Sequence, residues 1–443
     1  MGSGRSGPDY YFLFEGIMSD ACQGAAEIAA SFERVKTEYN QICGMKLSLD
    51  LSRGKPGKEQ LDLVSPLLSC LQDGEECIGP DGTDYRNYGL LDGIPGMKKI
   101  FSDLYGIPED TIIIGGNSSL NLMYDTIARA MMFGVPGGKG PWGREDHVTF
   151  LCPSPGYDRH FLICETMGIT MIPVPMTPTG PDMDEVERLC ATDASVKGIW
   201  CVPKYSNPDG YTYSDETVHR LASMKTAAGD FRIFWDNAYG IHDIYGRGDT
   251  LSDIMEECRK AGNPERIYYF ASTSKVTFPG AGVAMMAMCG ENLKMTKKLL
   301  GVQTIGHDKV NQIRHVKYFG NADNVRALMK KQAEILRPKF ALVDEKLSSG
   351  LGSTGFAKWT RPNGGYFVSL YVEQGCAKRV YDLCAGAGVK LTGAGAAFPY
   401  GKNPLDNHIR IAPTYPSIED LGNALDCLVL CVKYASLEKR MAK

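Results

Sequence analysis

Short apolar runs recur through the middle of the chain, and amphipathic or polar stretches separate them. Each run is nearly continuous in apolar residues and has a turn signal nearby, so each predicts a strand covered on both faces, as in a mostly parallel sheet. Seven such runs occur: Thr111–Ile114, Val148–Cys152, Ile169–Val174, Gly198–Val202, Phe231–Trp235, Ile267–Phe270 and Val283–Cys289. The stretches Asp184–Cys190 and Asp215–Lys225 have helical spacing behind an aspartate, which is a helix start signal. Strands that alternate with crossover helices predict a large α/β domain.

The pattern changes after about residue 305. A long helix is predicted over Val325–Ser349, a short strand at His408–Ile411, and a closing helix from Ile418. Between them lie a glycine pair followed by an apolar run, Gly364–Leu370, and a Gly/Ala-rich loop. We therefore expect a second, smaller α+β domain. The predicted boundaries are residues 1–60 for an N-terminal segment that joins the small domain, 61–310 for the large domain and 311–443 for the small domain.

Composition and charge narrow the class of protein. The 443 residues are 43% hydrophobic and 23% charged, which is normal for a globular protein of two domains. The net charge of −4 shows no basic excess, so we expect no nucleic-acid binding. No apolar stretch approaches the roughly 20 residues that cross a bilayer, and we expect neither a membrane segment nor a secretory signal. The Gly/Ser-rich opening, Met1–Pro8, could be an expression scar.

The fourteen cysteines form no C-x-x-C pair and no Cys/His cluster with zinc-ligand spacing. Several fall inside apolar runs, where a thiol behaves as a small hydrophobic side chain. We therefore expect no metal site and interpret the cysteines as reduced thiols of a cytoplasmic protein.

Three segments carry candidate chemistry. A glycine pair and small polar residues, Gly115–Ser119, join a predicted strand to an amphipathic helix, where a phosphate could bind or a serine could simply cap the helix. Asp236 ends a strand, where it could pair with a ligand ring nitrogen or cap a following element. Lys275 follows another strand among hydroxyl groups, where partial burial would let its amine form a Schiff base; a surface lysine is the alternative.

These segments occur in order with Asn207-Pro208-Asp209-Gly210, Tyr239, Ser272 and Arg410. The set resembles the fold-type I pyridoxal-phosphate aminotransferases of class I, over nearly the whole chain after about residue 48. The sequence around these motifs is most similar to the bacterial aspartate aminotransferase subgroup Ic, notably at Leu51–Gly57, Asp84–Gly89 and Pro153–Tyr157. The resemblance implies a large domain with a mostly parallel central sheet, a smaller α+β domain, and pyridoxal 5'-phosphate as cofactor.

The resemblance also implies catalytic roles. Lys275 would hold the cofactor as a Schiff base and shuttle a proton, while Asp236 would pair with the pyridine nitrogen and make the ring a better electron sink. Asn207 and Tyr239 would bond the phenolic oxygen of the ring, and Tyr157 would stack on the ring face.

The phosphate would be held by Gly116, Asn117 and Ser118 together with Ser272. Tyr88 would reach it from a neighbouring subunit, which implies a homodimer with shared active sites. Many relatives carry a phosphate-binding arginine after the lysine, but Phe278–Gly282 contains none. The small-domain Pro-Gly turn of many relatives is also replaced here, by Thr392–Gly395.

The implied reaction moves an amino group from an amino acid, aspartate, to a 2-oxo acid, 2-oxoglutarate. Arg410 would grip the α-carboxylate through its two-pronged guanidinium. Arg53 is the candidate for the distal carboxylate, and we expect structural hydrogen bonds from His160 and His242. Lys55, Lys204, Arg159 and Arg361 could bind the distal carboxylate in place of Arg53.

Two other functions stay open at this point. A β-lyase or decarboxylase would use the same Lys275 and Asp236. A non-catalytic regulator with an aminotransferase-like domain would need an attached DNA-binding domain, and the residues before the first motif are neither basic nor patterned as one.

Overall fold

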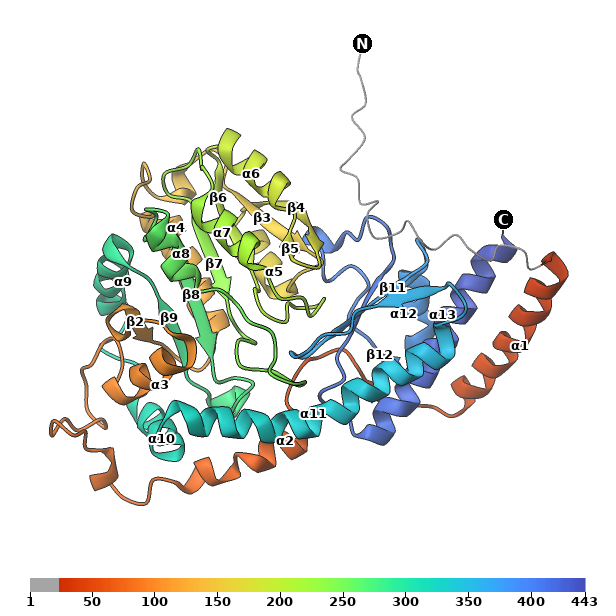
Figure 1. Ribbon diagram of the computed structural model, residues 1–443, viewed down its shortest axis with the longest axis horizontal. Helices are drawn as coiled ribbons and strands as arrows, with labels where there is room; N and C mark the ends of the chain where they lie inside the picture. The colour runs from red at the N-terminus through yellow and green to blue at the C-terminus, as the bar shows by residue number, and fades with distance from the viewer. Residues whose placement is uncertain (1–23, 443) are drawn as a thin grey trace, which may run out of the picture.

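A computed structural model describes residues 24–442, so the interpretation of Met1–Pro8 lies outside the described residues. The predicted fold class is confirmed: a large α/β region is joined to a smaller α+β region (Figure 1). An eight-stranded sheet in the order β2-β9-β8-β7-β6-β3-β4-β5 forms the centre of the large region. Its strands are β2 (Ile112–Ile114), β3 (Thr149–Ser154), β4 (Thr170–Thr177), β5 (Gly180–Pro181), β6 (Val196–Cys201), β7 (Arg232–Asp236), β8 (Ile267–Ser272) and β9 (Ala284–Ala287).

The five central strands β4, β3, β6, β7 and β8 run parallel, whereas β9 is antiparallel to both of its neighbours and β5 is an antiparallel edge strand. Each of the seven predicted apolar runs overlaps one of these strands. Only the two-residue β5 has no counterpart among the predictions, because so short a segment leaves no periodic pattern.

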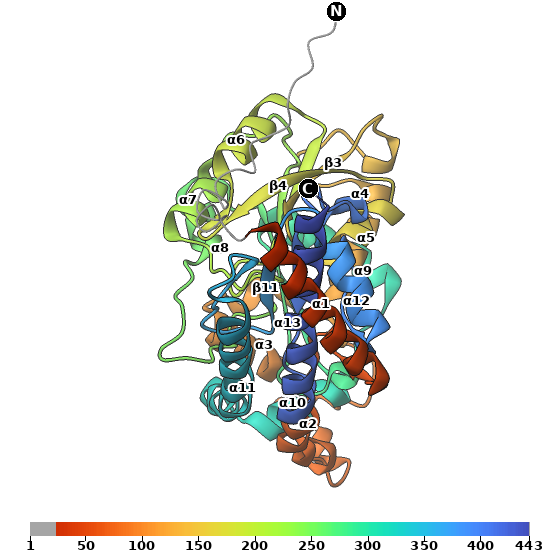
Figure 2. The ribbon, with the colours of Figure 1, turned by 90° about the vertical axis from the view of Figure 1, so that its right-hand side faces the viewer.

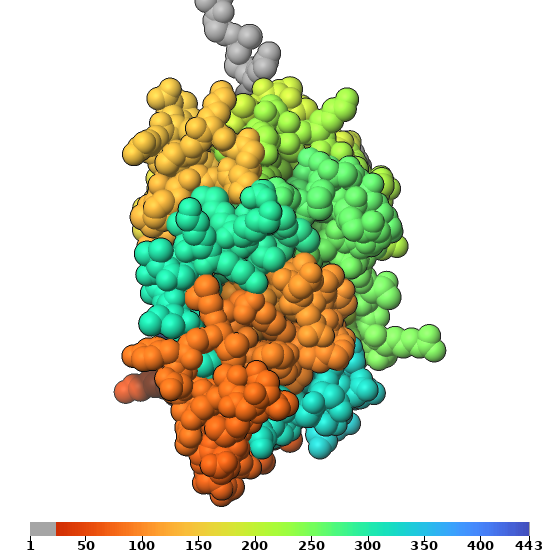
Figure 3. Space-filling model, turned by 90° about the vertical axis from the view of Figure 1, so that its left-hand side faces the viewer, coloured from red at the N-terminus to blue at the C-terminus, as the bar shows by residue number. Residues whose placement is uncertain are grey.

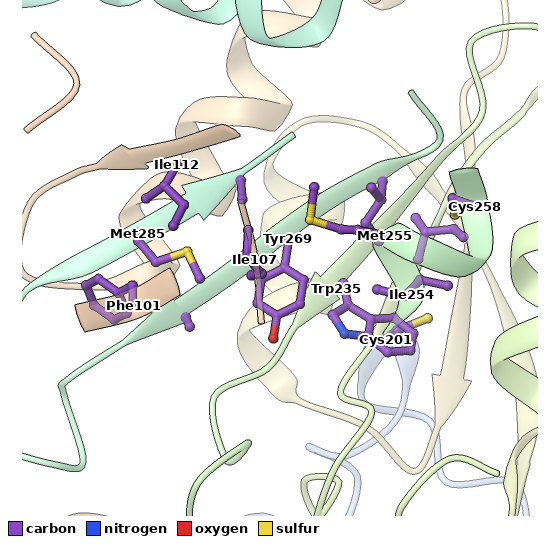
Figure 4. Packing of buried hydrophobic residues seen from close by; sticks show 14 of the residues in the cluster. Phe101, Ile107, Ile112, Cys201, Trp235, Ile254, Met255, Cys258, Tyr269 and Met285 are labelled. Atoms are coloured by element: carbon purple, nitrogen blue, oxygen red, sulfur yellow. The ribbon is translucent and has the colours of Figure 1, made fainter. Parts of the chain in front are cut away.

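Both faces of the sheet are covered, which explains why the strands are nearly continuous in apolar residues. Along β7, Ile233 and Trp235 pack into the core on one face and Phe234 into the core on the other. Figure 4 shows the first of these cores, where Trp235 and Tyr269 of adjacent strands lie side by side. Each such buried side chain contributes about 1.5–3 kcal/mol relative to exposure. The first face packs against α3 (Pro95–Tyr105), α6 (Met183–Thr192), α7 (Asp215–Ser223) and α8 (Ile254–Lys260); the second packs against α4 (Ser119–Phe133), α5 (Asp158–Thr166) and α9 (Gly290–Gln303).

The smaller region is built around an antiparallel sheet, and the N-terminal segment packs on it. α1 lies along α13 (Figure 2), and β1 pairs in parallel with β12. The elements are α1 (Ala25–Gly44), β1 (Leu49–Asp50), β10 (Ala357–Trp359), β11 (Val368–Val372), α12 (Ala377–Gly386), β12 (Val389–Lys390), β13 (His408–Ile411) and α13 (Ile418–Met441).

One helix belongs to both regions. α11 (Ala322–Leu351) begins beside α10 (Lys309–Phe319) and runs along the bottom of the molecule past α2 (Lys58–Leu63) in Figure 1. Leu328 lies in the core of the large region, whereas Leu336 and Phe340 lie in the core of the small one. The boundaries at residues 60 and 310 stay a prediction. No helix within residues 24–442 is both long and apolar enough to span a bilayer.

Candidate active site

A cavity of about 590 Å³ lies at the carboxyl ends of the central strands, and residues of both regions line it. This is where ligand sites of open α/β sheets form. It brings together nine of the predicted residues, namely Arg53, Ser118, Tyr157, Asn207, Asp236, Tyr239, Ser272, Lys275 and Arg410. Gly116, Asn117 and Tyr88 are not among the lining residues.

The amine of Lys275, which lines this cavity, lies near two aromatic rings. The Nζ atom lies 4.9 Å from the ring centroid of Tyr239 and 5.9 Å from that of Tyr366. Burial lowers the pKa of the Lys275 amine below its ordinary value, and the negative charge of Asp236 opposes part of that shift. A lowered pKa leaves more of the amine unprotonated and nucleophilic near neutral pH. Lys275 is half-buried and lines the cavity, which favours the Schiff-base role over the alternative of an ordinary surface lysine.

Asp236 is the last residue of β7 and is 2% exposed. Its Oδ2 lies 3.1 Å from Nε2 of His160, whose ring stacks on Trp200 at a centroid distance of 4.3 Å. Its Oδ1 is buried and accepts no hydrogen bond from any residue of the described chain. An unpaired buried carboxylate oxygen is costly, and a protonated ring nitrogen in the cavity would satisfy it. No helix begins at Asp236, so the capping role considered for it is wrong.

Two phenols and an amide line the same cavity as this carboxylate. Tyr157 precedes α5, Tyr239 follows β7, and burial raises the pKa of both phenols, which keeps them neutral. A neutral phenol can donate a hydrogen bond to a ligand oxygen. Asn207 is 5% exposed, and its Oδ1 accepts a hydrogen bond of 3.1 Å from Nη1 of Arg410.

Arg410 is fixed in β13 by contacts on several sides. Its Nη1 also lies 3.3 Å from Oδ1 of Asp158, and its Nη2 donates to Oγ1 of Thr392 at 3.1 Å and to the carbonyl of Ser52 at 3.5 Å. The guanidinium lies over the ring of Phe367 at 4.9 Å. Its Nε is buried and has no partner within residues 24–442. An anchored guanidinium with spare donor capacity is suited to a carboxylate.

Small hydroxyl groups line the end of the cavity where α4 begins. Ser118 caps this helix by accepting a hydrogen bond of 3.2 Å from the backbone of Leu120, so the simple capping role is confirmed. Ser272 donates to Ser274 at 3.0 Å, and Ser274 donates to the carbonyl of Asn117 at 3.2 Å. The helix N-terminus and these hydroxyls form a corner that fits a phosphate.

The loop after Lys275, which has no arginine over Phe278–Gly282, is held by side chains of α10. Asn311 donates to the carbonyls of Ala281 and Gly282 at 3.2 and 2.8 Å. Nε2 of His315 lies 3.0 Å from Oγ1 of Thr277, and burial lowers the pKa of His315 to about 4. A neutral histidine and an amide therefore fix this loop.

Four cations surround the mouth of the cavity: Arg53, Lys55, Arg159 and Lys390. Two cations considered for the distal carboxylate, Lys204 and Arg361, are not among the lining residues. Lys204 pairs with Asp243 at 2.8 Å and Arg361 with Asp344 at 2.7 Å. Lys390 was missed by sequence reasoning. It reaches the mouth because β12 pairs with β1, a contact that leaves no local signal.

The two histidines behave differently. His160 makes the expected structural hydrogen bond, to Asp236. His242 does not, because both of its ring nitrogens are buried without a partner in the described chain. Burial and the nearby Lys275 lower the pKa of His242 to about 3, so its ring is neutral.

Known proteins share this architecture. A family described as "Aspartate amino-transferase" matches residues 23–443. An aminotransferase of Mycolicibacterium smegmatis is 47% identical over 422 residues, covering 95% of this chain and 99% of its own. The crystal structure of an aspartate transaminase from Corynebacterium glutamicum ATCC 13032 superposes with a TM-score of 0.92 at 45% identity, covering 94% of this chain and 98% of that one.

The chain belongs to the aspartate aminotransferase family. This match confirms the resemblance to bacterial aspartate aminotransferases, and it confirms the prediction that the protein is an aminotransferase. A likeness in fold alone extends to the alpha-aminoadipate aminotransferase of Thermus thermophilus, complexed with N-(5'-phosphopyridoxyl)-L-leucine, with a TM-score of 0.72 at 18% identity. That match covers 94% of this chain and 98% of the Thermus one.

Proposed function

We propose that this aminotransferase moves the amino group of aspartate to 2-oxoglutarate, with pyridoxal 5'-phosphate bound at Lys275. The proposal rests on one observation: the side chains of Asp236 and Lys275 line the same cavity. Asp236 presents an unpaired buried carboxylate oxygen, and Lys275 presents an amine whose pKa is lowered by burial. The cofactor is a pyridine ring with an aldehyde opposite its nitrogen. The carboxylate would pair with the ring nitrogen, and the amine would bond the aldehyde carbon.

The remaining residues fit the same cofactor. Ser118 and Ser272 would hold the phosphate, helped by the backbone at Gly116 and Asn117. Tyr157 would cover the ring face, and Asn207 and Tyr239 would bond its phenolic oxygen. When bound, the cofactor supplies an electron sink for the electrons released at the substrate α-carbon.

The protein supplies the proton transfer and the orientation. The amine of Lys275 would take the proton from the substrate α-carbon as a general base and would return it, as a general acid, to the former aldehyde carbon of the cofactor. Arg410 holds the α-carboxylate, and the substrate replaces its two longest contacts, those to Asp158 and to the carbonyl of Ser52. The phenol of Tyr239 stays protonated and donates a hydrogen bond.

The preference for dicarboxylates rests on charge. Apart from Lys275, five cations and two acidic residues line the cavity of a chain whose net charge is −4. Such a local excess attracts a doubly charged substrate beside a phosphate. Arg53 remains the candidate for the distal carboxylate, and Lys390 lines the same cavity. A relative from Corynebacterium glutamicum that is 45% identical over 414 residues is named aspartate aminotransferase.

The homodimer with shared active sites also belongs to this proposal. Segments near residue 90 and near residue 300 lie side by side on one face (Figure 3), where Lys297 pairs with Asp92 at 2.7 Å. Exposed apolar side chains gather on these segments, with Tyr88 at 80%, Val302 at 87% and Ile305 at 60% exposure. Large exposed apolar groups of this kind suit an interface with a second copy. From it, Tyr88 would reach the neighbouring phosphate.

The free thiols of the described residues support the further proposal that the protein is cytoplasmic. All cysteines within residues 24–442 are free, which suits a reducing compartment.

A spectrophotometric screen tests the proposed function. Purified protein is loaded with pyridoxal 5'-phosphate and mixed with single amino acids. Aspartate should convert the absorbance band of the lysine-bound aldehyde to that of the amine form, and 2-oxoglutarate should restore it. Pyruvate and ammonia released without any oxo acid would favour a β-lyase instead. A band that never cycles with any amino acid would refute amino transfer.

A further inference from the structure

The turn that carries Lys275 has two carbonyl groups that receive side chains from distant segments. The backbone N–H of Val276 donates to Thr273, which closes the turn, but no backbone N–H within residues 24–442 donates to the carbonyls of Lys275 and Val276. The hydroxyl of Tyr366 donates to the carbonyl of Lys275 at 3.3 Å. The amide of Gln332 donates to the carbonyl of Val276 at 2.8 Å.

A third side chain joins these two. Gln60 donates through Nε2 to the Tyr366 hydroxyl at 3.0 Å and to Oε1 of Gln332 at 3.1 Å. Its own Oε1 accepts a hydrogen bond of 3.1 Å from the backbone of Gly57. Gln60 and Gln332 are each 1% exposed and Tyr366 is fully buried. Every side-chain polar atom of the three has a partner, so the network is complete and rigid.

The three side chains come from separate parts of the fold. Gln60 lies in α2, a few residues after the segment Ser52–Lys55 that lines the cavity. Gln332 lies in α11, the helix shared by both cores, and Tyr366 precedes β11 of the small region. The network therefore connects the N-terminal segment, the shared helix and the small region to the two peptide units at the lysine.

We infer that Gln60, Gln332 and Tyr366 are positioning residues for Lys275. They fix the main chain at the lysine, and thereby the direction in which its amine enters the cavity. They also couple that direction to the segment that carries Arg53. The inference rests on the proposed function only in taking the Lys275 amine as the reacting group. A displacement of about 1 Å in a reacting group can slow a reaction by about 10²-fold.

The test measures how fast Lys275 condenses with an aldehyde, a step separate from amino transfer. Cofactor-free protein is mixed with pyridoxal 5'-phosphate; the amine adds to the aldehyde carbon, water leaves, and a carbon–nitrogen double bond forms. Absorbance gives the rate, and the mass of the borohydride-reduced adduct identifies the residue. Tyr366→Phe removes one oxygen atom, and Gln332→Met removes the amide at similar volume.

Both variants should condense roughly 10- to 100-fold more slowly than the unchanged protein. The pH of half-maximal rate should rise, because a displaced amine regains contact with water. Tyr39→Phe is the matched control. It removes a hydroxyl that donates to the carbonyl of Leu383 at 3.0 Å, in the small region and away from the cavity. Its rate and pH midpoint should equal those of the unchanged protein.

The inference is wrong if Tyr366→Phe and Gln332→Met condense within twofold of the unchanged rate at an unchanged pH midpoint, even where their unfolding temperatures fall. Should Gln332→Met fail to fold, Tyr366→Phe alone decides the question. Failure of the proposed function has a different signature, since there the unchanged protein forms no adduct or never transfers an amino group.

Discussion

The inner end of the cavity and its mouth hold their charged groups in opposite ways. At the inner end, Asp236 and His160 are buried against each other. The turn that carries Lys275 accepts hydrogen bonds from the side chains of Gln332 and Tyr366. At the mouth, Arg53, Lys55 and Lys390 are exposed. Buried groups keep one orientation and suit bond-making steps, which demand fixed geometry. Exposed cations can turn toward a substrate, and each contributes little alone. The comparison assigns the chemistry to the inner end and the choice of substrate to the mouth.

The largest effect is expected from Lys275→Ala. Without the amine, the group positioned to carry the proton is lost, and amino transfer should fall by at least about 10⁴-fold. The fold should persist, as circular dichroism can check, because backbone carbonyls hold the turn. Lys260→Ala, which removes an exposed lysine paired with Glu257, should leave the rate unchanged. Turnover near the original rate in Lys275→Ala would sink the assignment.

Asp236→Asn should have the next largest effect, about 10²- to 10³-fold on the rate of transfer, since a fixed charge beside the ring is lost. The sign of a second effect follows from the pKa of Lys275. The Asp236 carboxylate favours the ammonium form, so removing it should lower that pKa further. The pH of half-maximal condensation between the amine and pyridoxal 5'-phosphate should therefore move down. A midpoint that moved up would contradict the geometry.

Arg410→Lys should raise the KM for all amino acids by roughly 100-fold, because a point charge cannot replace a two-pronged guanidinium that Asn207 and Thr392 hold in place. Aspartate and alanine should be affected alike, since both carry the α-carboxylate. A KM change limited to aspartate would show that Arg410 binds the distal carboxylate and not the α-carboxylate. Steady-state kinetics with both amino acids decides between these outcomes.

The smallest effects should come from the mouth. Arg53→Gln and Lys390→Gln should each raise the KM for aspartate about 2- to 10-fold while leaving that for alanine unchanged. High salt should reduce the difference, because it screens exposed charges. Lys358→Gln, on the outer strand β10, is the control and should change neither KM. If the KM for aspartate and the KM for alanine rose equally, the mouth of the cavity would not select the substrate by its distal carboxylate.

Much of this protein follows from local sequence. The apolar runs predicted the strands because a strand buried on both faces is apolar at nearly every position, and Ile233, Phe234 and Trp235 show both faces in use. The motifs around Asp236 and Lys275 predicted the inner end of the cavity, since each residue lies at or just past the end of its own strand.

Tertiary structure decided the rest. Whether Arg53 or Lys390 faces the cavity depends on the pairing of β1 with β12, which are more than 300 residues apart. The hydrogen-bond network of Gln60, Gln332 and Tyr366 likewise has no periodic signal, because hydrogen bonds between distant segments impose no spacing on the chain.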